Sequence, residues 1–172
     1  MTLSIRREKP GDEHAVYTLN LRAFGRDSEP KIVDELRKNC PEGISMVAEQ
    51  DGRIIGHILF TPARIEGEEK GIPGMGLGPM AVLPECQGKG AGSALIRAGL
   101  AVVRRTGSLF VAVVGHPRFY PKFGFVPASR YGVRCPYEGV PDDAFMVHAF
   151  DPQAFRGVHG IVRMRPEFDS AL

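Results

Sequence analysis

The sequence lacks the cysteine patterns that define two classes of small protein. It has only three cysteines, Cys40, Cys86 and Cys135, which are widely spaced and include no C-x-x-C pair. An odd number of scattered cysteines supports neither a disulfide framework nor a zinc cluster. We therefore expect free thiols in a reducing compartment and no metal site.

Long apolar runs and blocks of one charge are also missing. The longest apolar run, residues 109–114, is far too short to cross a bilayer, and no apolar stretch follows the charged N-terminal residues 1–9. Lysine and arginine are scattered among acids, with a net charge of +2, so no nucleic-acid surface is indicated. The sequence predicts a soluble, cytoplasmic protein that binds neither membrane nor nucleic acid.

The composition that is present suits one ordinary globular domain. The 172 residues are 43% apolar and 24% charged, which is enough for one full hydrophobic core but would leave two domains cramped. The chain has no internal repeat, long linker or low-complexity tract. We predict a single domain over residues 1–172.

The first 40 residues read as a strand followed by two helices. Residues 3–7 alternate apolar and charged side chains, as a half-buried strand does. Asp12 is expected to cap the first helix and Gly25 to end it. Ser28 is expected to cap the second helix, which stops at Cys40 and the following proline.

A hairpin and a further strand follow. Residues 45–50 and 53–62 are strand-like and are joined by Asp51-Gly52, the dipeptide favoured where a tight turn needs positive φ. Residues 66–71 form a polar connection to a strand at residues 75–83. These elements predict an antiparallel arrangement in the first half of the sheet.

A helix and a buried strand then change the pattern to a parallel one. Helical periodicity runs from Gly90 to Gly107, and residues 109–114 form a continuous apolar run typical of a central strand. Further strands are expected at residues 144–150 and 158–165. The predicted fold class is α/β, with a mixed, mostly antiparallel twisted sheet of six or seven strands, a central parallel β-α-β unit and flanking helices. The apolar face expected for the helix comprises Ala94, Leu95, Ala98 and Val102.

The turn between residues 80 and 93 has the chemistry of an anion site. It leaves a strand and opens a helix, so backbone N–H groups without helical partners point outward at the positive end of the helix dipole. Glycines there let the backbone approach a phosphate, and Lys89 and Ser93 add polar groups. A diphosphate group is the expected ligand of this turn. The residues of the turn expected to bind it are Gln87, Gly88, Lys89, Gly90, Ala91, Gly92 and Ser93.

Two common glycine motifs do not fit this turn. A nucleotide-hydrolase loop requires G-K-[ST], but Lys89 is followed by Gly90. A dinucleotide fingerprint requires a third glycine where Ser93 stands, and an acid about twenty residues on, which residues 104–114 lack. Both nucleotide-binding interpretations are therefore disfavoured.

The spacing Q-x-x-G-x-G, at Gln87, Gly90 and Gly92, resembles that of the GNAT superfamily of acetyl-coenzyme A-dependent N-acetyltransferases. A second segment, Y-x-x-x-G-F beginning at Tyr120, also resembles a motif of that family. The two occur in the family's order with a buried strand between them. The specific likeness lies between about residues 80 and 125, within a similar order of elements.

The resemblance implies a single GNAT-like domain with acetyl-CoA as cosubstrate and an acceptor amine, which stays unidentified. It implies that the pantetheine arm lies along the fourth strand, where Gly78-Pro79 suits a break in pairing. Direct attack in a ternary complex would then use the Val82 N–H to polarise the thioester carbonyl and Tyr120 as general acid. The resemblance also implies cofactor contacts from Met80, Ala81, Val82, Tyr120 and Phe123.

The general base stays open at this stage. Many members of the family carry a glutamate near the end of the fourth strand, but residues 77–83 contain no acid. His116 could act directly or through water, and a glutamate elsewhere or bulk water could do the same. Each residue also has a structural interpretation, since His116 precedes Pro117 in a turn and Tyr120 suits a core aromatic.

Two other functions are compatible with the sequence. One is a non-catalytic CoA-binding sensor or regulatory module, and the other is an acyltransferase with a different acyl donor or acceptor. The acceptor is expected between the first two helices and the loop at residues 129–143, which carries Arg130, Tyr131, Arg134, Tyr137 and Glu138. The oligomeric state is open, with a homodimer among the options.

Overall fold

The computed structural model describes residues 2–67 and 71–170. Part of the predicted polar connection, residues 68–70, and both ends of the predicted domain therefore lie outside the described residues. The helices are α1 (Glu13–Phe24), α2 (Ser28–Asn39) and α3 (Ala91–Arg104). The strands are β1 (Leu3–Arg7), β2 (Ile44–Gln50), β3 (Arg53–Glu66), β4 (Ile72–Val82), β5 (Phe110–Val114), β6 (Val126–Pro127), β7 (Val133–Arg134), β8 (Phe145–Ala149) and β9 (Gly160–Arg163).

All of these strands belong to one mixed sheet. Its order is β1-β2-β3-β4-β5-β8-β6, and β9 pairs with both β3 and β7. The β4–β5 and β7–β9 pairs are parallel and the others antiparallel. The predicted α/β fold class and the central parallel unit are confirmed. Nine strands occur in the described residues instead of six or seven, because the loop after β5 contains β6 and β7, each of two residues.

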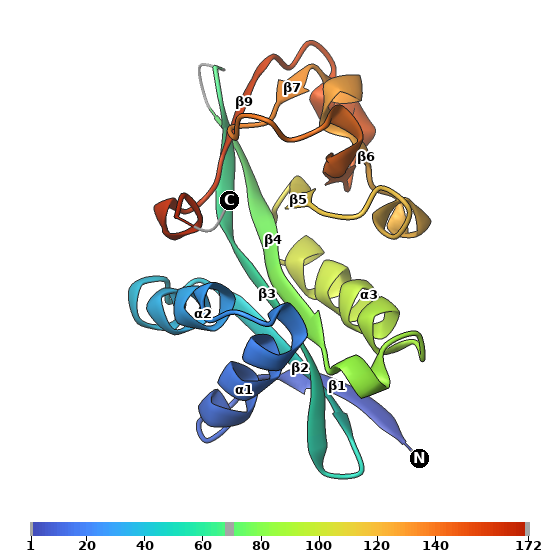
Figure 1. Ribbon diagram of the computed structural model, residues 1–172. Helices are drawn as coiled ribbons and strands as arrows, with labels where there is room; N and C mark the ends of the chain where they lie inside the picture. Colours follow the sequence, from blue (N-terminus) through green and yellow to red (C-terminus); the bar gives the residue numbers. More distant parts are fainter. Residues whose placement is uncertain (1, 68–70, 171–172) are drawn as a thin grey trace.

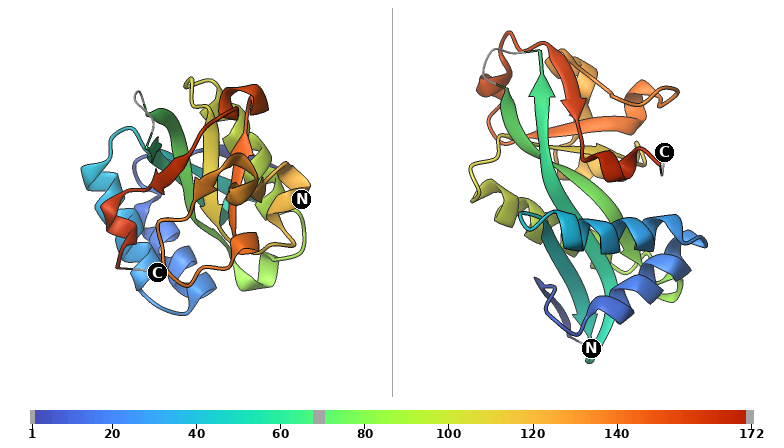
Figure 2. Two further views of the ribbon diagram at one scale, coloured as in Figure 1. Left: turned by 90° about the horizontal axis from the view of Figure 1, so that it is seen from above. Right: turned by 90° about the vertical axis from the view of Figure 1, so that its left-hand side faces the viewer.

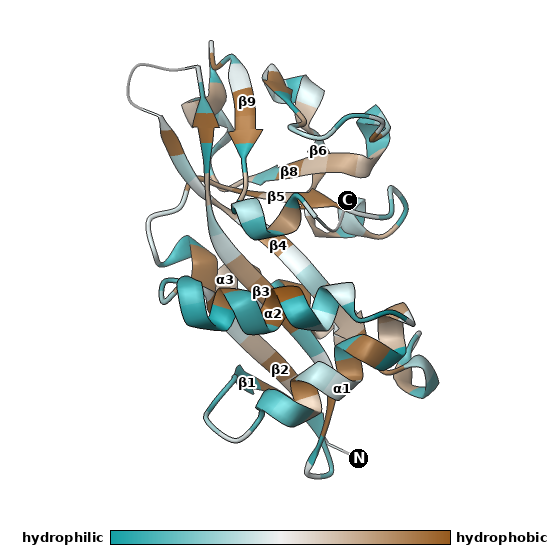
Figure 3. Cartoon of the chain, turned by 60° about the vertical axis from the view of Figure 1, so that its left-hand side comes forward, coloured by the Kyte–Doolittle hydropathy of each residue, from teal (hydrophilic) through white to brown (hydrophobic). Residues whose placement is uncertain are grey.

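The helices cover opposite faces of the twisted sheet (Figures 1 and 2). On one face Val16 of α1 and Ile32 of α2 pack with Leu59 of β3. On the other, Leu95 of α3 belongs to the same buried cluster as Phe60 of β3. Successive residues of β3 therefore face different helices, as strand geometry requires. Figure 3 shows hydrophilic residues alternating with hydrophobic ones along α2, which has one buried face.

The predicted hairpin is present, with positive φ at Asp51 (52°) and Gly52 (77°). Gly25 ends α1 as predicted, with a φ of 69°, whereas the N-terminal caps of the two helices differ from the prediction. Asp12 stands at the N-cap of α1 but makes no side-chain cap bond, because its carboxylate accepts hydrogen bonds from Arg6 and from the Lys9 N–H. Ser28 is not the N-cap of α2, since the helix already begins at Ser28.

The buried face of α3 is displaced by about one residue from the predicted one. Its buried residues are Ala91, Leu95, Ile96, Gly99 and Val103, and of the predicted set only Leu95 is among them. Gly99 explains the shift, because a Cβ there would lie 2.4 Å from the Phe60 ring. The helix therefore approaches β3 through its glycine, a contact that apolar periodicity does not reveal.

Within the described parts of the chain, no helix combines the length and the apolar character needed to cross a membrane. The three cysteines are free thiols, as predicted.

Candidate functional site

The central feature of the site is a strand edge that loses its neighbour. In the described residues β4 pairs with β5 only over residues 75–77, against residues 111–113. Immediately afterwards Gly78 and Pro79 together oppose the single residue Leu59 of β3, which is a β-bulge. The bulge lies where the sequence predicts a break in pairing. Beyond it, β4 continues beside β3 alone, and a gap opens between β4 and β5.

The backbone polar groups of β4 in this gap face away from β3. The Leu83 N–H donates to the Ile55 carbonyl at 2.9 Å, so these two residues form a hydrogen-bonded pair. Because such pairs alternate along an antiparallel ladder, the backbone groups of Val82 and Met80 point toward the opposite edge. The Val82 carbonyl accepts a bond from Gln87 Nε2 at 3.1 Å, which leaves its N–H to the gap.

The glycine turn carries the chain from β4 into α3. A 3₁₀ turn at Pro84–Cys86 is followed by Gly88 and Gly90, with φ of 73° and 96°. Side chains rarely adopt these values, so the turn requires glycine at both positions. The first internal bond of α3 runs from the Ala94 N–H to the Gly90 carbonyl. The N–H groups of residues 91–93 therefore lie at the positive helix end without helical acceptors.

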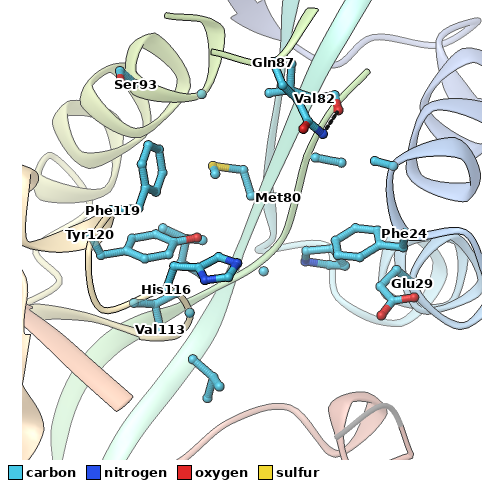
Figure 4. A pocket seen from close by; sticks show the side chains of 18 of the residues that line it. Phe24, Glu29, Met80, Val82, Gln87, Ser93, Val113, His116, Phe119 and Tyr120 are labelled. Carbon is cyan, nitrogen blue, oxygen red and sulfur yellow. Dashed lines mark hydrogen bonds between the residues drawn. The ribbon is translucent and has the colours of Figure 1, made fainter. Parts of the chain in front are cut away.

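A cavity of about 1030 Å³ joins this turn to the gap beside β4. Figure 4 shows Gln87 bonded to Val82 at one end and Met80 between two walls. Most residues predicted for the site line this one cavity. They are Met80, Ala81, Val82, Gln87, Gly88, Gly90, Ala91, Gly92, Ser93, His116 and Tyr120.

Two predicted residues do not line the cavity. Lys89 turns back, and its Nζ donates to the Glu85 carbonyl at 3.0 Å. The Phe123 ring packs against Phe119 with a centroid distance of 5.3 Å, and the Arg97 guanidinium lies over the Phe123 ring at 5.2 Å from its centroid. Lys89 and Phe123 thus hold the cavity-forming segments in place.

Tyr120 is packed among aromatic rings, and its hydroxyl points into the cavity near His116 (Figure 4). Its ring makes edge contacts with Phe119 at 5.2 Å and Phe125 at 5.5 Å between centroids. Only 7% of the residue is exposed. Burial raises the pKa of Tyr120 to about 12, because the charged phenolate is poorly solvated there. The phenol is therefore protonated throughout the neutral range.

His116 begins the turn that carries Tyr120. Its carbonyl accepts hydrogen bonds from the N–H groups of Phe119 at 3.1 Å and Tyr120 at 3.4 Å. Its imidazole lines the same cavity (Figure 4). His116 therefore both stabilises the turn and lines the cavity near the Tyr120 hydroxyl.

Gly115 is expected to be required for the position of Tyr120. A Cβ at Gly115 would lie 2.2 Å from the tyrosine ring, so one of the two must move. We expect Gly115→Ala to lower the free energy of unfolding by about 1–3 kcal/mol, as overpacking does, measured by urea denaturation. Gly92→Ala is the control, because its nearest contact would be an ordinary 3.5 Å. Equal stability of the two variants would contradict this expectation.

The wall opposite Tyr120 was only partly predicted. This far wall is lined by α1 and α2, as expected, and by Tyr137, whereas the other four loop residues expected near the acceptor do not line the cavity. Arg130 and Tyr131 line a separate pocket of about 330 Å³. Sequence reasoning missed the C-terminal contribution and the buried acid of α2. We define the far wall as Phe24, Arg26, Glu29, Ile32, Tyr137, Met164 and Phe168.

Glu29 is the buried charge of the far wall. Its carboxylate accepts hydrogen bonds from Arg26 Nε at 2.9 Å and from the Ser28 hydroxyl at 2.8 Å. Burial by itself would raise the pKa of Glu29, but the bonds from Arg26 and Ser28 outweigh it and the pKa lies below its usual value. The carboxyl group is therefore an anion at neutral pH. Figure 4 shows Glu29 beside Phe24.

Comparison with known proteins places these features in a family. Residues 4–128 match the model of the acetyltransferase (GNAT) domain. The chain is 33% identical over 166 residues to YhbS of Escherichia coli K12, an uncharacterized N-acetyltransferase, covering 96% of this chain and 98% of the relative. It is 37% identical over 135 residues to YjhQ of the same organism, covering 77% and 74%.

Two solved structures resemble the whole chain. YhbS of Escherichia coli in complex with CoA has a TM-score of 0.88 and 32% identity, covering 97% of this chain and 92% of that one. A GNAT family acetyltransferase from Brucella melitensis in complex with acetyl-CoA has a TM-score of 0.78 and 35% identity, covering 98% and 99%.

Proposed function

This chain belongs to the GNAT family of acetyltransferases, and we propose that it moves an acetyl group from acetyl-CoA to an acceptor amine within a ternary complex. One observation carries the proposal. The unpaired edge of β4, the first turn of α3 and the Tyr120 hydroxyl all face one cavity. A thioester cofactor needs these three features for its pantetheine amides, its diphosphate and its sulfur.

The cosubstrate is expected to bind in two parts. The diphosphate accepts hydrogen bonds from the N–H groups of the glycine turn and the first turn of α3, at the positive helix end. The pantetheine arm takes the place of a strand beside β4 and pairs with the backbone groups of Met80 and Val82. The relatives bound to CoA and acetyl-CoA support this assignment of the ligand.

The chemical step follows from these positions. The amine nitrogen attacks the thioester carbonyl, and the Val82 N–H stabilises the resulting oxyanion, which such a donor does by about 3 kcal/mol. The carbon–sulfur bond then breaks, and Tyr120 donates its proton to the departing sulfur. His116 accepts the proton of the amine, directly or through water. The products are an N-acetylated amine and free CoA.

A methyl group at Gly92 tests the cofactor turn. Its Cβ would lie 3.5 Å from Phe119 and 3.8 Å from Met80 and Val82, so the fold tolerates it. The methyl would nevertheless enter the gap between α3 and β4, and we expect Gly92→Ala to raise the Kd for acetyl-CoA about tenfold or more. Calorimetry measures this change. Ala101→Ser, on the exposed face of the same helix, should leave the Kd unaltered, and equal affinities in both variants would contradict the cofactor position.

The decisive test of the proposal combines binding with turnover. Calorimetry of the purified protein with acetyl-CoA should show saturable binding, and a thiol-release assay with a panel of amines should show acceptor-dependent CoA formation. Binding without turnover would identify a CoA-binding sensor instead of an enzyme. Faster turnover with succinyl-CoA or longer acyl-CoA would identify a different acyl donor. No binding at millimolar concentrations would overturn the proposal.

A further inference from the structure

One long stretch of the chain carries positive charge without any acid. Residues 86–134 contain eight lysines and arginines and no aspartate or glutamate, although the whole chain has 22 basic and 20 acidic side chains. None of the ion pairs between described residues involves this stretch. It includes the glycine turn, α3 and the turn of Tyr120, which line the side of the cavity opposite the far wall. That side of the cavity therefore attracts anions.

Lys122 is the cation of this stretch that lines the cavity. Of the described residues that line it, only Lys122 and Arg26 are lysine or arginine, and Arg26 is paired with Glu29 on the far wall. Lys89, the cation expected in the glycine turn, donates instead to the Glu85 carbonyl. Lys122 has a contact with an aromatic ring but no ion pair among the described residues. The cavity lining thus includes one lysine without a counter-charge.

An aromatic pair holds Lys122 near the start of α3. The Lys122 Nζ lies 5.2 Å from the centroid of the Phe119 ring, and the same ring would lie 3.5 Å from a Cβ at Gly92. Phe119 packs edge-on against Phe123, and the Arg97 guanidinium lies over the Phe123 ring at 5.2 Å. Arg97 belongs to the second turn of α3. Both cations therefore lie close to the first turn of α3, where the diphosphate is expected.

The 3′-phosphate of CoA is an anion that suits this position. It is attached to the same ribose as the diphosphate, so a diphosphate at the first turn of α3 places the 3′-phosphate one sugar away. A phosphomonoester carries a charge of about −1.5 to −2 at neutral pH, and its oxygens accept hydrogen bonds from ammonium and guanidinium groups. Lys122 and Arg97 have no acidic partner among the described residues, so they bind such a phosphate without breaking an ion pair.

We propose that Lys122 and Arg97 bind the 3′-phosphate of the acyl donor, and that the protein thereby selects CoA thioesters over donors that lack this phosphate. The inference rests on the proposed function, because it places the donor in the same cavity. Both cations act at the nucleotide end of the donor and not at its thioester. They therefore determine the affinity for the donor and leave the chemical step unchanged.

Two donors that differ by one phosphate test the site. Acetyl-dephospho-CoA lacks only the 3′-phosphate of acetyl-CoA. Calorimetry at low ionic strength should give acetyl-CoA a Kd about tenfold lower than that of acetyl-dephospho-CoA. Because both cations are exposed, the ratio of the two Kd values should shrink as salt is added. Equal Kd values for the two donors at low ionic strength would overturn the inference.

Variants of the two cations test the residues. Lys122→Gln and Arg97→Gln should each raise the Kd for acetyl-CoA about three- to tenfold and leave the Kd for acetyl-dephospho-CoA nearly unchanged, whereas Lys122→Arg should keep the preference. Arg105→Gln is the matched control, because this exposed arginine ends the same helix about two turns beyond Arg97, and it should alter neither Kd. Equal losses of affinity for both donors in the Gln variants would assign Lys122 and Arg97 to aromatic packing alone and overturn the inference.

Failure of this inference can be told apart from failure of the proposed function. Saturable binding of acetyl-CoA without any preference over acetyl-dephospho-CoA would refute the phosphate site and leave the proposed function standing. If neither donor binds at millimolar concentrations, the proposed function fails and the phosphate site fails with it.

Discussion

Replacement of Tyr120 by phenylalanine is expected to lower kcat by about 10²- to 10⁴-fold, the range that general acid catalysis supplies, without changing the Kd for acetyl-CoA. The substitution removes one oxygen and keeps the ring. The aromatic contacts with Phe119 and Phe125 therefore persist, and the cavity keeps its shape. Only the hydroxyl that we propose as proton donor to the departing sulfur is lost.

The effect should be large because the CoA thiolate, if it left without a proton, would be poorly solvated inside the cavity. An ordinary thiol has a pKa of about 8.5, whereas burial raises the pKa of Tyr120 to about 12. A full proton transfer to a solvated thiolate would thus be unfavourable. The same desolvation raises the pKa of a thiol released inside the cavity, so the donor and acceptor approach each other in basicity as the carbon–sulfur bond breaks. The raised pKa of Tyr120 therefore suits the proposed transfer of its proton to a buried sulfur.

Steady-state CoA release and calorimetry on the same preparations measure the two quantities. Tyr17→Phe, a partly buried tyrosine of α1 that does not line the cavity, is the control and should retain wild-type kcat. A Tyr120→Phe variant with kcat within about threefold of wild type would exclude general acid catalysis by this residue, since even the low end of the expected range is larger.

The part of the candidate site formed by the end of β4 and the start of α3 could be predicted because it is local in sequence. The strand end, the two positive-φ glycines and the helix start occupy residues 80–93, so one stretch of chain carries both the geometry and the chemistry. The bulge at Gly78 and Pro79 could also be predicted, because proline cannot donate a hydrogen bond to a neighbouring strand. Tyr120 and His116 follow within a few residues of the next strand, where the same cavity continues.

The far wall could not be predicted in the same way because distant segments build it. Glu29 follows the start of α2 and reads as an ordinary acid of a first helical turn. Its burial depends on packing that brings Met164 and Phe168 against the N-terminal helices. No local pattern encodes that contact. The outward turn of Lys89, which bonds to the Glu85 carbonyl instead of facing the cavity, likewise depends on the three-dimensional path of the loop.

A buried hydrogen-bond network fixes the helices of the far wall to the sheet. His57 of β3 is fully buried. Its Nδ1 lies 3.2 Å from Asn20 Nδ2 of α1, and its Nε2 lies 2.9 Å from the Ser45 hydroxyl. Ser45 in turn donates to Glu8, whose carboxylate pairs with Arg37 of α2. The network therefore joins both helices to β2 and β3.

The partners of His57 assign its neutral tautomer. Asn20 Nδ2 also donates to the Val16 carbonyl at 2.9 Å, so it faces the imidazole as a donor and Nδ1 must accept. The proton is then on Nε2 and is donated to Ser45. Protonation of Nδ1 would set two donors against each other in a buried site. Burial first, and the nearby charge of Arg37 second, accordingly lower the pKa of His57 to about 3.

Stability is therefore expected to fall as the pH drops below about 6.5, the usual pKa of histidine in an unfolded chain. Between that value and the folded-state pKa the unfolded chain binds the extra proton, so the free energy of unfolding decreases by up to about 1.4 kcal/mol per pH unit. The loss should reach about 2 kcal/mol at pH 5 relative to pH 7.5. Burial also lowers the pKa of His148, which adds a contribution of the same sign.

Urea denaturation at a series of pH values from 7.5 to 5 measures this slope. His57→Gln should be less stable at pH 7.5, because one bond of the network is lost, yet its stability should change much less with pH, since the amide does not titrate. His148→Gln should remove only a part of the slope. The depressed pKa values of Asp12 and Glu29 contribute only at lower pH, as those carboxylates become protonated. An unchanged slope in His57→Gln would show that the proton taken up on unfolding binds elsewhere, and the anchoring of the far wall would then not depend on a neutral imidazole.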